Sequence, residues 1–392
     1  MTQTTPTRTT PTPTTRRALA RAIEPLDHER FLDEHWERKP LVVPRAEDGR
    51  FDDLLSVRDV ERLVTETGLR LPGFRLVKAG ETISDYTTDL PWRPAAFTGV
   101  ADVRRVLEEF EAGATIVLQG LHHLWLPLAR YCRQLEAFLG HPVQANAYYT
   151  PAGSQGLPVH HDTHEVISLQ VAGEKRWLVY EPALELPLKN QRYRSALGAP
   201  GEPVLDVTLK AGDTMYLPRG WLHQALTSGS DSLHVTVGVN VRRWVDEARA
   251  ELVAVEAELE FRQAIDSEEP PALPVLDAEE VRRRARDRFV FSRRPILDGQ
   301  LSELRALGSL TPETELERRD TVIADLHGTT LVFEGRRLRF PERLAAELRF
   351  LVLSDGPFTA SQLPGSLDEA GRLVLLRKLV REGFLRRSGA AA

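Results

Sequence analysis

The sequence predicts a mainly β core that is flanked by helical segments and followed by a small α+β unit. From about residue 143 to residue 241, short stretches rich in β-branched and aromatic residues alternate with clusters of Gly, Pro, Asp and Ser, which is the pattern of strands and turns. No helix of crossover length is predicted between them, so an all-β sandwich or barrel, such as a jelly roll, is favoured over a parallel α/β sheet. The predicted strands are residues 144–149, 166–171, 176–180, 204–209, 214–217 and 233–239.

The region before this core is predicted to be mixed. Helices are predicted for residues 54–65, 103–110 and 125–139, and a strand for residues 115–118. Asp53 or Ser56 could cap the first helix, and Gly140 ends the last one. Residues 1–18 are rich in Thr and Pro and contain no acidic residue. Because repeated prolines block a helix, we expect these residues to form a disordered tail.

After the core, the pattern becomes helical and then mixed again. Residues 245–265 and 279–289 have helical spacing, and a Pro-rich break over residues 268–274 separates them. Residues 293–320 show no clear pattern and are interpreted as a linker. A last unit, residues 321–392, is predicted to contain a hairpin, three helices and a closing strand, an order typical of a winged helix. These elements are residues 322–326 and 330–333, then 341–353, 359–363 and 367–381, and finally 384–387.

Length and composition narrow the class of protein. The chain has 392 residues, room for two or three domains, and a net charge of -6, which argues against a dedicated nucleic-acid binder. Its one cysteine, Cys132, excludes an intramolecular disulfide and a thiolate zinc cluster. Any metal must therefore be held by imidazole and carboxylate groups. No apolar run approaches the roughly 20 residues of a membrane span, and we expect a cytoplasmic protein.

The densest group of metal-binding side chains is the segment 159–164, VHHDTH. On a strand, side chains i and i+2 share a face, so His160 and Asp162 would converge while His161 points away. A barrel can bring a distant strand beside them, and His223, which follows a Tyr-Leu-Pro strand, supplies a third ligand. Two imidazoles and one carboxylate on one face of an octahedral ion leave three open positions, the arrangement of non-haem Fe(II) oxygenases. We therefore predict His160, Asp162 and His223 as metal ligands.

The same pattern predicts a co-substrate. Two of the open positions could take a keto acid such as 2-oxoglutarate, whose distal carboxylate needs a buried cation. Lys175, at the start of the predicted strand 176–180, is the best-placed cation. A His-x-Asp pair alone is weak evidence, because it occurs by chance in many chains and a lone histidine is more often packed or exposed than a ligand. The β-rich context, the distant histidine and the lysine together favour the metal site.

Two sequence blocks resemble the core of the JmjC-type ribosomal oxygenases, a cupin-like family. Residues 144–177 read QANAYYTPAGSQGLPVHHDTHEVISLQVAGEKRW, and residues 212–237 read GDTMYLPRGWLHQALTSGSDSLHVTV. Residues 36–43, WERKPLVV, are similar to the family's N-terminal signature. The resemblance spans about residues 31–244. It implies a double-stranded β-helix that binds Fe(II) and 2-oxoglutarate, with residues 19–244 as its catalytic domain.

The resemblance also implies roles for individual residues and regions. It places the three predicted ligands on the metal and Lys175 on the distal carboxylate of 2-oxoglutarate, with no catalytic residue beyond the metal ligands. Asn146 and Tyr148 match positions that line the pocket near substrate and co-substrate. Residues 245–292 would form a dimerisation region and residues 321–392 a winged helix, whose contact with nucleic acid stays open. The substrate would be an arginyl or histidyl residue of a ribosomal protein, with arginyl favoured.

Other chemically active residues have ordinary structural explanations. His164 could support the metal site or be a solvated loop residue, and His234 is expected in the core or the pocket rather than as a fourth ligand. The pair His122-His123 lies outside both blocks and is expected to be structural. Glu165 stands where members of the family often carry aspartate.

Two further functions stay open on the sequence alone. The same scaffold could hydroxylate a free amino acid or a peptide natural product. Alternatively, the chain could be a catalytically silent cupin-like binding or regulatory protein that acts through its winged helix. The last predicted helix has a basic face formed by Arg377, Lys378 and Arg381. The neighbouring acids Glu369 and Glu382 reduce its positive charge and so weaken the indication of a nucleic-acid surface. The intact metal triad and its lysine argue against a silent protein.

Overall fold

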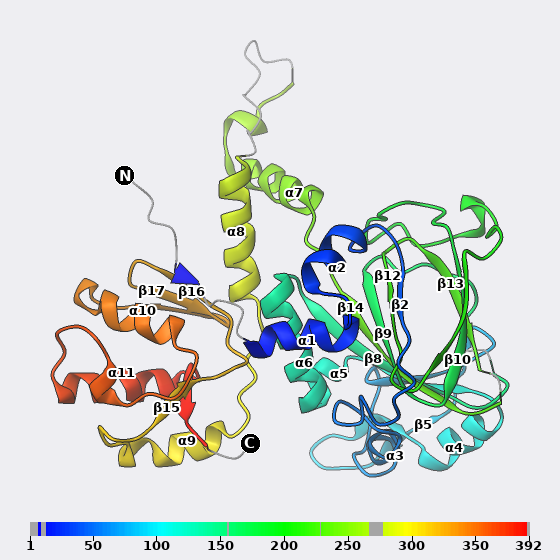
Figure 1. Ribbon diagram of the computed structural model, residues 1–392, viewed down its shortest axis with the longest axis horizontal. Helices are drawn as coiled ribbons and strands as arrows, with labels where there is room; N and C mark the ends of the chain where they lie inside the picture. The colour runs from blue at the N-terminus through cyan, green and yellow to red at the C-terminus, as the bar shows by residue number, and fades with distance from the viewer. Residues whose placement is uncertain (1–6, 9–12, 155–156, 228, 266–276, 390–392) are drawn as a thin grey trace. The chain divides into compact units, whose positions relative to one another are not determined.

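The computed structural model describes residues 7–8, 13–154, 157–227, 229–265 and 277–389 (Figure 1). The chain divides into two compact units. One comprises Pro13–Val241 and is called the core unit below; the other comprises Arg242–Ala392 with Met1–Thr12 and is called the C-terminal unit. The division falls within three residues of the predicted end of the catalytic domain at residue 244.

Two antiparallel sheets form the framework of the core unit. Within the described residues, the larger sheet has the order β2 (Leu41–Val43), β12 (Thr214–Leu217), β9 (Glu165–Ala172), β14 (Ser232–Val239), β8 (Val143–Thr150), β7 (Thr115–Leu118), β3 (Phe74–Lys78) and β4 (Glu81–Thr82). The smaller sheet has the order β11 (Leu205–Lys210), β10 (Glu174–Tyr180) and β13 (Leu222–Leu226). All of these pairings are antiparallel. The predicted mainly β core is therefore confirmed.

The six strands predicted for this core are all present, and their ends differ from the prediction by at most two residues. Strand β13 was not predicted, because its sequence LHQAL contains no β-branched residue. It pairs with β10 along its whole length, from Arg176 opposite Leu226 to Tyr180 opposite Leu222. This strand matters because it carries His223.

Helices precede and interrupt these strands in the core unit. They are α1 (Pro13–Ile23), α2 (His28–Glu34), α3 (Val57–Thr65), α4 (Val103–Glu111), α5 (Leu121–Leu124) and α6 (Leu126–Leu139). Ser56 caps α3 and forms a capping box with Asp59, and α6 ends at Gly140, whose φ of 72° is easily adopted by glycine. Ser56, one of the two predicted caps, and the end at Gly140 are confirmed, but α3 begins at Val57 and not at residue 54.

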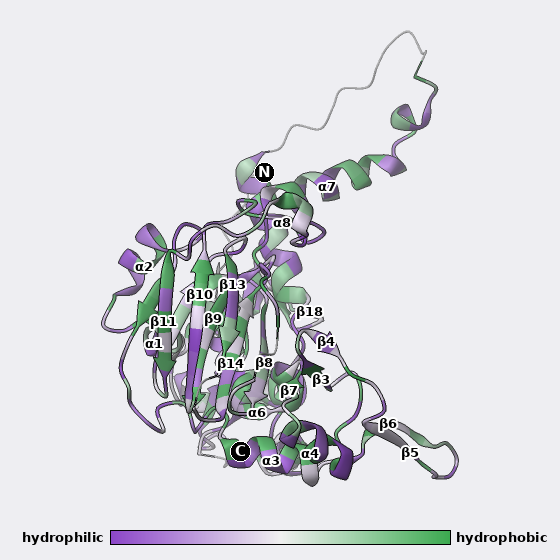
Figure 2. Cartoon of the chain, turned by 90° about the vertical axis from the view of Figure 1, so that its right-hand side faces the viewer, coloured by the Kyte–Doolittle hydropathy of each residue, from purple (hydrophilic) through white to green (hydrophobic). Residues whose placement is uncertain are grey.

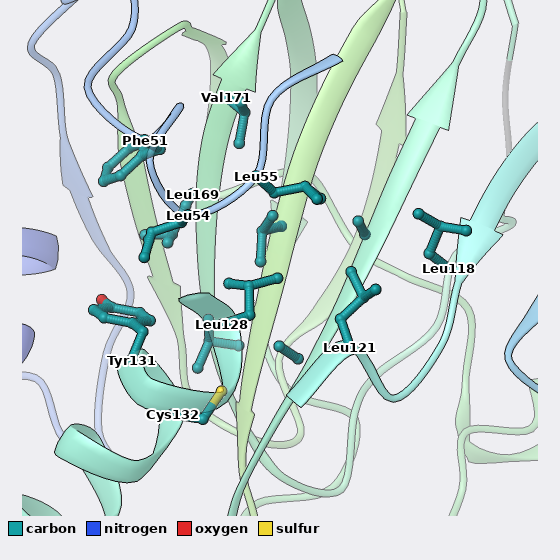
Figure 3. Packing of buried hydrophobic residues seen from close by; sticks show 14 of the residues in the cluster. Phe51, Leu54, Leu55, Leu118, Leu121, Leu128, Tyr131, Cys132, Leu169 and Val171 are labelled. Atoms are coloured by element: carbon teal, nitrogen blue, oxygen red, sulfur yellow. The ribbon is translucent and has the colours of Figure 1, made fainter. Parts of the chain in front are cut away.

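The main hydrophobic core lies between α6 and the larger sheet. Figure 3 shows Leu128 and Cys132 of α6 in the same cluster as Leu169 and Val171 of β9. Leu55, from the segment before α3, is fully buried in the same cluster. Full burial of one such aliphatic side chain stabilises the fold by about 1.5–3 kcal/mol. This packing fixes one face of the larger sheet and leaves the other face free to form a site.

A β-hairpin extends away from the two sheets (Figure 2). It consists of β5 (Thr87–Leu90) and β6 (Phe97–Ala101), which pair antiparallel. Trp92 in its turn is 67% exposed and lies 6.0 Å from the ring of Phe97. The sequence analysis did not predict this hairpin.

The prediction of a disordered tail over residues 1–18 is wrong for two parts of this segment. Thr7–Arg8 form the short strand β1, which pairs with β16 of the C-terminal unit, and α1 begins at Pro13. Proline fits the first turn of a helix, because its missing N–H has no partner there in any case. The other residues of the predicted tail, 1–6 and 9–12, lie outside the described residues.

The C-terminal unit combines helices with two small sheets. Its helices are α7 (Trp244–Ala254), α8 (Ala278–Phe291), α9 (Gln300–Ala306), α10 (Ala345–Leu353) and α11 (Glu369–Arg381). One sheet has the order β1, β16 (Ala324–His327), β17 (Thr330–Phe333) and β18 (Arg336–Arg339), and the other pairs β15 (Leu316–Arg318) with β19 (Leu385–Arg387). None of the helices in the described part of the chain has the length and apolar character that a membrane crossing requires.

Several predictions for this unit need correction. The long helix over residues 245–265 ends at Ala254 and is followed by two 3-10 turns, and the helix over residues 359–363 is a single 3-10 turn. The linker over residues 293–320 is wrong, because this segment contains α9 and β15 and buries Leu310 in the hydrophobic core of the unit. The predicted hairpin, the last long helix and the closing strand are present. The predicted break at residues 268–274 lies outside the described residues.

Candidate metal centre

The structure brings the three predicted ligands together across an isolated β-bridge. The backbone of His160 pairs with that of His223, with N–O distances of 3.1 and 2.8 Å in the two directions. The sequence predicted a strand around His160, but this segment is not a regular strand. The bridge is its only strand-like pairing among the described residues. It is sufficient to set the alternation, because Asp162 faces the two histidines.

The ligand atoms of this triad are close enough to share one ion. One ligand atom from each of His160, Asp162 and His223 lies within 4.8 Å of the others. The Nε2 atom of His223 is 3.7 Å from Oδ2 of Asp162, and the two imidazole centroids are 4.4 Å apart. Two imidazoles and one carboxylate are the donor set of a facial triad.

Hydrogen bonds hold each imidazole in the tautomer that a metal requires. Nδ1 of His160 lies 2.8 Å from the carbonyl oxygen of Pro158, and Nδ1 of His223 lies 3.0 Å from that of Trp221. Because a carbonyl oxygen only accepts, each Nδ1 carries the proton and leaves the Nε2 lone pair for the ion.

The charges of the triad also suit a cation. Burial is the main cause that lowers the pKa of His223 to about 4, with a contribution from His160, so this imidazole is neutral at neutral pH. Burial would raise the pKa of Asp162, but the surrounding histidines, His164 first, outweigh it and lower that pKa. Asp162 therefore remains a carboxylate.

The triad opens into a cavity of about 420 Å³ that lies between the two sheets of the core unit. Lys175 of β10 lines this cavity and is 3% exposed. Its Nζ donates a hydrogen bond to Oγ1 of Thr150 at 3.0 Å, and no acidic side chain of the described residues lies within ion-pair distance of it. Burial lowers the pKa of Lys175 to about 7. A buried amine without an anionic partner suits the carboxylate of a ligand.

Two further polar groups in the cavity have no protein partner. Nδ1 of His234 and Nε1 of Trp177 are buried and accept or donate no hydrogen bond within the described structure. The ring of His234 stacks on that of Tyr148, with centroids 4.9 Å apart and an angle of 4°. His234 was predicted to lie in the core or in the pocket, and it lines the pocket. It is not part of the metal group, as expected.

The two predicted pocket residues on β8 are placed differently. Tyr148 lines the cavity, and burial raises the pKa of its hydroxyl to about 12. Asn146 is not among the residues that line the cavity; its Oδ1 accepts a hydrogen bond from the backbone N–H of Gly120 at 2.9 Å. A role for Asn146 near the ligand therefore stays a prediction.

A buried ionic network supports the segments that carry the ligands. Nη1 of Arg219 lies 2.6 Å from Oε1 of Glu165 and 2.5 Å from Oε1 of Glu37. The hydroxyl of Tyr216 donates to Glu165 at 2.5 Å and accepts from the N–H of Glu37 at 2.9 Å. The network thus joins the N-terminal signature to the parts of the chain that follow Asp162 and precede His223.

Neighbouring histidines take three different roles. His161 points away from the triad, as predicted, and its Nε2 lies 2.9 Å from the carbonyl oxygen of Gln191. His164 supports the site rather than lying in a solvated loop, because its Nδ1 is 3.8 Å from Oδ1 of Asp162. Nδ1 of His122 accepts a hydrogen bond from the N–H of Ala145, which fits the predicted structural role.

A second group of metal-capable side chains occurs in the C-terminal unit, formed by Asp287, Asp325 and His327. Its carboxylates already have cationic partners: Arg286 contacts Asp325 at 3.1 Å, and Arg283 contacts Asp287 at 3.3 Å. We interpret this group as a structural ion-pair cluster.

Comparison with known proteins finds a family whose model matches part of the core unit. Residues 121–246 match the family described as the JmjC domain. This segment of the chain is similar to a JmjC domain. The matched segment contains all three candidate ligands and Lys175, and the resemblance to JmjC-type ribosomal oxygenases is confirmed.

Named relatives of this JmjC domain include larger proteins. The chain is 32% identical over 236 residues to a bifunctional lysine-specific demethylase and histidyl-hydroxylase NO66 of Drosophila persimilis, which aligns 57% of this chain with 31% of that protein. It is 35% identical over 221 residues to ribosomal oxygenase 2 of Mus musculus, aligning 55% of this chain with 45% of that protein. The chain thus spans less than half the length of these two relatives.

Solved structures show the same fold. A ribosomal oxygenase YcfD from Escherichia coli, in complex with cobalt and 2-oxoglutarate, superposes with a TM-score of 0.56 at 20% sequence identity. The superposition covers 93% of this chain and 99% of that chain. The JmjC fold of the core is therefore confirmed.

Proposed function

We propose that this chain is an Fe(II)- and 2-oxoglutarate-dependent oxygenase that hydroxylates an amino-acid side chain of a ribosomal protein. One observation carries the proposal: the metal triad lines the same cavity as a buried lysine that has no acidic partner among the described residues. The names of the relatives, ribosomal oxygenase and histidyl-hydroxylase, give the substrate class. The cobalt and 2-oxoglutarate bound to the Escherichia coli protein of the same fold support the choice of metal and co-substrate.

Each group of the cavity would have a defined task. His160, Asp162 and His223 would hold the iron, and Lys175 would bind the distal carboxylate of 2-oxoglutarate. When bound, iron and 2-oxoglutarate with dioxygen supply the oxidation that converts a C–H group to C–OH, with release of succinate and carbon dioxide. The protein would orient both reactants and exclude water, because Lys175 and His223 are buried.

The buried lysine favours binding of a dianionic co-substrate. A charged amine in an apolar environment is destabilised, which is why burial lowers the pKa of Lys175. A carboxylate beside it restores the charged form, so binding would be coupled to uptake of a proton above about pH 7. Tyr148 would lie near the bound ligands, and Asn146 would position the backbone at Gly120.

We place the assembly and the location in line with this function. Residues 245–292 would form a homodimer contact, since Leu252, Val253 and Leu259 are 54%, 61% and 73% exposed on this segment. Residues 321–392 would form a winged-helix-like unit, and its contact with nucleic acid is left open. The protein would act in the cytoplasm, where ribosomal proteins are made.

The proposal is tested by supplying the purified chain with Fe(II), 2-oxoglutarate and ribosomal proteins. We expect release of succinate and a mass increase of one oxygen atom on a ribosomal protein. The Asp162→Ala variant should lose both, because it removes the only carboxylate of the triad. Unchanged succinate release by this variant would refute the metal assignment.

Two other outcomes of this assay are informative. Succinate release with free amino acids, and none with ribosomal proteins, would indicate the small-molecule alternative. The absence of bound iron and of any 2-oxoglutarate turnover, together with binding to DNA, would indicate a regulatory protein.

A further inference from the structure

Arg75 places a second cation in the cavity, on the larger sheet, whereas Lys175 lies on the smaller sheet. It lies on β3, where Arg75 and Val77 both face the cavity. Strand pairing sets Arg75 opposite Val117 of β7, and Val117 opposite Tyr148 of β8. Arg75 therefore belongs to the same cross-strand row as Tyr148, whose ring stacks on His234. The sequence analysis did not identify Arg75.

The two cations of the cavity serve different rows. Lys175 contacts Thr150, which is two residues along β8 from Tyr148, and rows two residues apart are separated by about 7 Å. On β3, the row of Thr150 is occupied by Val77 and not by Arg75, since Val77 pairs with Thr115. Arg75 is thus available to a ligand group other than the carboxylate that Lys175 would bind.

Hydrogen-bonding capacity of Arg75 is largely unused within the protein. Among the described residues, its Nε is buried without a partner, and its Nη1 makes a long contact to Oγ1 of Thr82 at 3.5 Å. No carboxylate of the described residues is within ion-pair distance of it. Among the described residues that line the cavity, Asp162 is the only acidic one, and it belongs to the metal triad.

From this arrangement we infer that Arg75 selects the side chain to be hydroxylated. The inference rests on the proposed function and narrows its substrate class. A guanidinium donates hydrogen bonds and accepts none, so it favours a group with an accepting atom, such as an imidazole or a carboxamide, over a cationic group. An arginyl or lysyl side chain entering the same cavity would meet a like charge and find no spare carboxylate. The acceptor is therefore histidyl or another residue without a positive charge, in contrast to the arginyl residue favoured by the sequence analysis.

Specificity can be read from the type of residue that is modified. Ribosomal proteins extracted from bacterial and from animal ribosomes are incubated with Fe(II), 2-oxoglutarate and the wild-type chain, and the sites that gain one oxygen atom are located by mass spectrometry. Three variants are compared in parallel: Arg75→Gln removes the charge, Arg75→Lys keeps it, and Arg104→Gln changes an exposed arginine of α4. Succinate release is measured in every reaction.

We expect wild type to modify histidyl or carboxamide side chains. Arg75→Gln should raise the modification of arginyl relative to histidyl residues by about tenfold, since relief of a like-charge contact at close range is worth at least that factor. Arg75→Lys and Arg104→Gln should keep the wild-type preference. Modification of arginyl residues by wild type, or an unchanged preference in Arg75→Gln, would overturn the inference.

Failure of the proposed function would look different. If no succinate is released under any condition, the oxygenase assignment itself is wrong. Succinate release without a modified ribosomal protein would refute the proposed substrate class, and the role of Arg75 that rests on it. A general loss of folding in Arg75→Gln would lower all modifications equally and would not shift their ratio, so the ratio separates selection from structure.

Discussion

Removal of Arg219 should destabilise the core unit strongly, because it leaves a buried charge without its counter-ion. The carboxylate of Glu165 is fully buried, and Arg219 is 6% exposed. In Arg219→Met, Glu165 would retain only the hydrogen bond from Tyr216. Breaking a buried pair in this way costs about 3–5 kcal/mol of the free energy of unfolding. For a domain of this size, the melting temperature should fall by about 10 °C.

The pH dependence of this loss tests its electrostatic origin. Burial holds the pKa of Glu165 above its usual value, while Tyr216 and Arg219 oppose that shift. Without Arg219 the folded-state pKa rises further, so the folded protein binds a proton more tightly than the unfolded chain. Stability is then recovered as the pH falls toward the folded-state pKa and is lost as the pH rises through it. Arg219→Met should be closer to wild type at about pH 5 than at about pH 8.

Urea unfolding of wild type, Arg219→Met, Glu165→Gln and the double variant at both pH values measures the effect. The double variant should be more stable than Arg219→Met, because a neutral amide replaces the unpaired carboxylate. If the double variant is no more stable, or if the loss in Arg219→Met is the same at both pH values, the charge argument is wrong.

Three further predictions concern the ligands and the assembly. Lys175→Ala should raise the Kd for 2-oxoglutarate by about tenfold or more, through loss of a charge-assisted bond. In wild type the affinity for 2-oxoglutarate should fall as the pH rises above about 7, because the amine must take up a proton. Calorimetry from about pH 6 to about pH 9 measures this dependence, and a flat profile would contradict it. Gly220→Ala should weaken iron binding and lower the stability of the fold. Gly220 has a φ of 93°, a Cβ there would lie 2.4 Å from the carbonyl oxygen of Leu184, and the N–H of Gly220 donates a hydrogen bond to the carbonyl oxygen of Asp162. Unchanged iron content would contradict this prediction. Leu252→Glu should yield a monomer by light scattering if the proposed dimer forms through α7, while Leu301→Glu, at an exposed site on α9, should not change the oligomeric state.

The sequence predicted the strands of the core well because their composition carries a local signal. Clusters of Gly, Pro and Asp mark their ends, and β-branched residues mark their interiors. Strand β13 lacks that signal and forms because β10 offers it an unpaired edge. Residues 293–320 were misread for a similar reason: the burial of Leu310 depends on α11 and on other residues far away in the sequence.

The candidate ligands were predictable, whereas the role that we propose for Arg75 was not. His160 and Asp162 are two residues apart, and His223 follows a recognisable turn, so their chemistry is visible in the sequence. Arg75 acquires its position only when β3 pairs with β7, and nothing near it in the sequence indicates a cavity. A residue of this kind is identified by the sheet order.

Under the roles that we propose for Lys175 and Arg75, the order of residues along β8 lets one cavity bind two ligands separately. Tyr148 and Thr150 face the cavity because they are two residues apart on one strand. The row of Thr150 leads to Lys175, and the row of Tyr148 leads to Arg75. A single cation between the rows could not distinguish the carboxylate of a co-substrate from the side chain of a protein. With two cations in separate rows, Lys175 can bind an anion while Arg75 rejects a cation. The affinity for the co-substrate and the choice of acceptor can then be changed independently, by substitution of different residues.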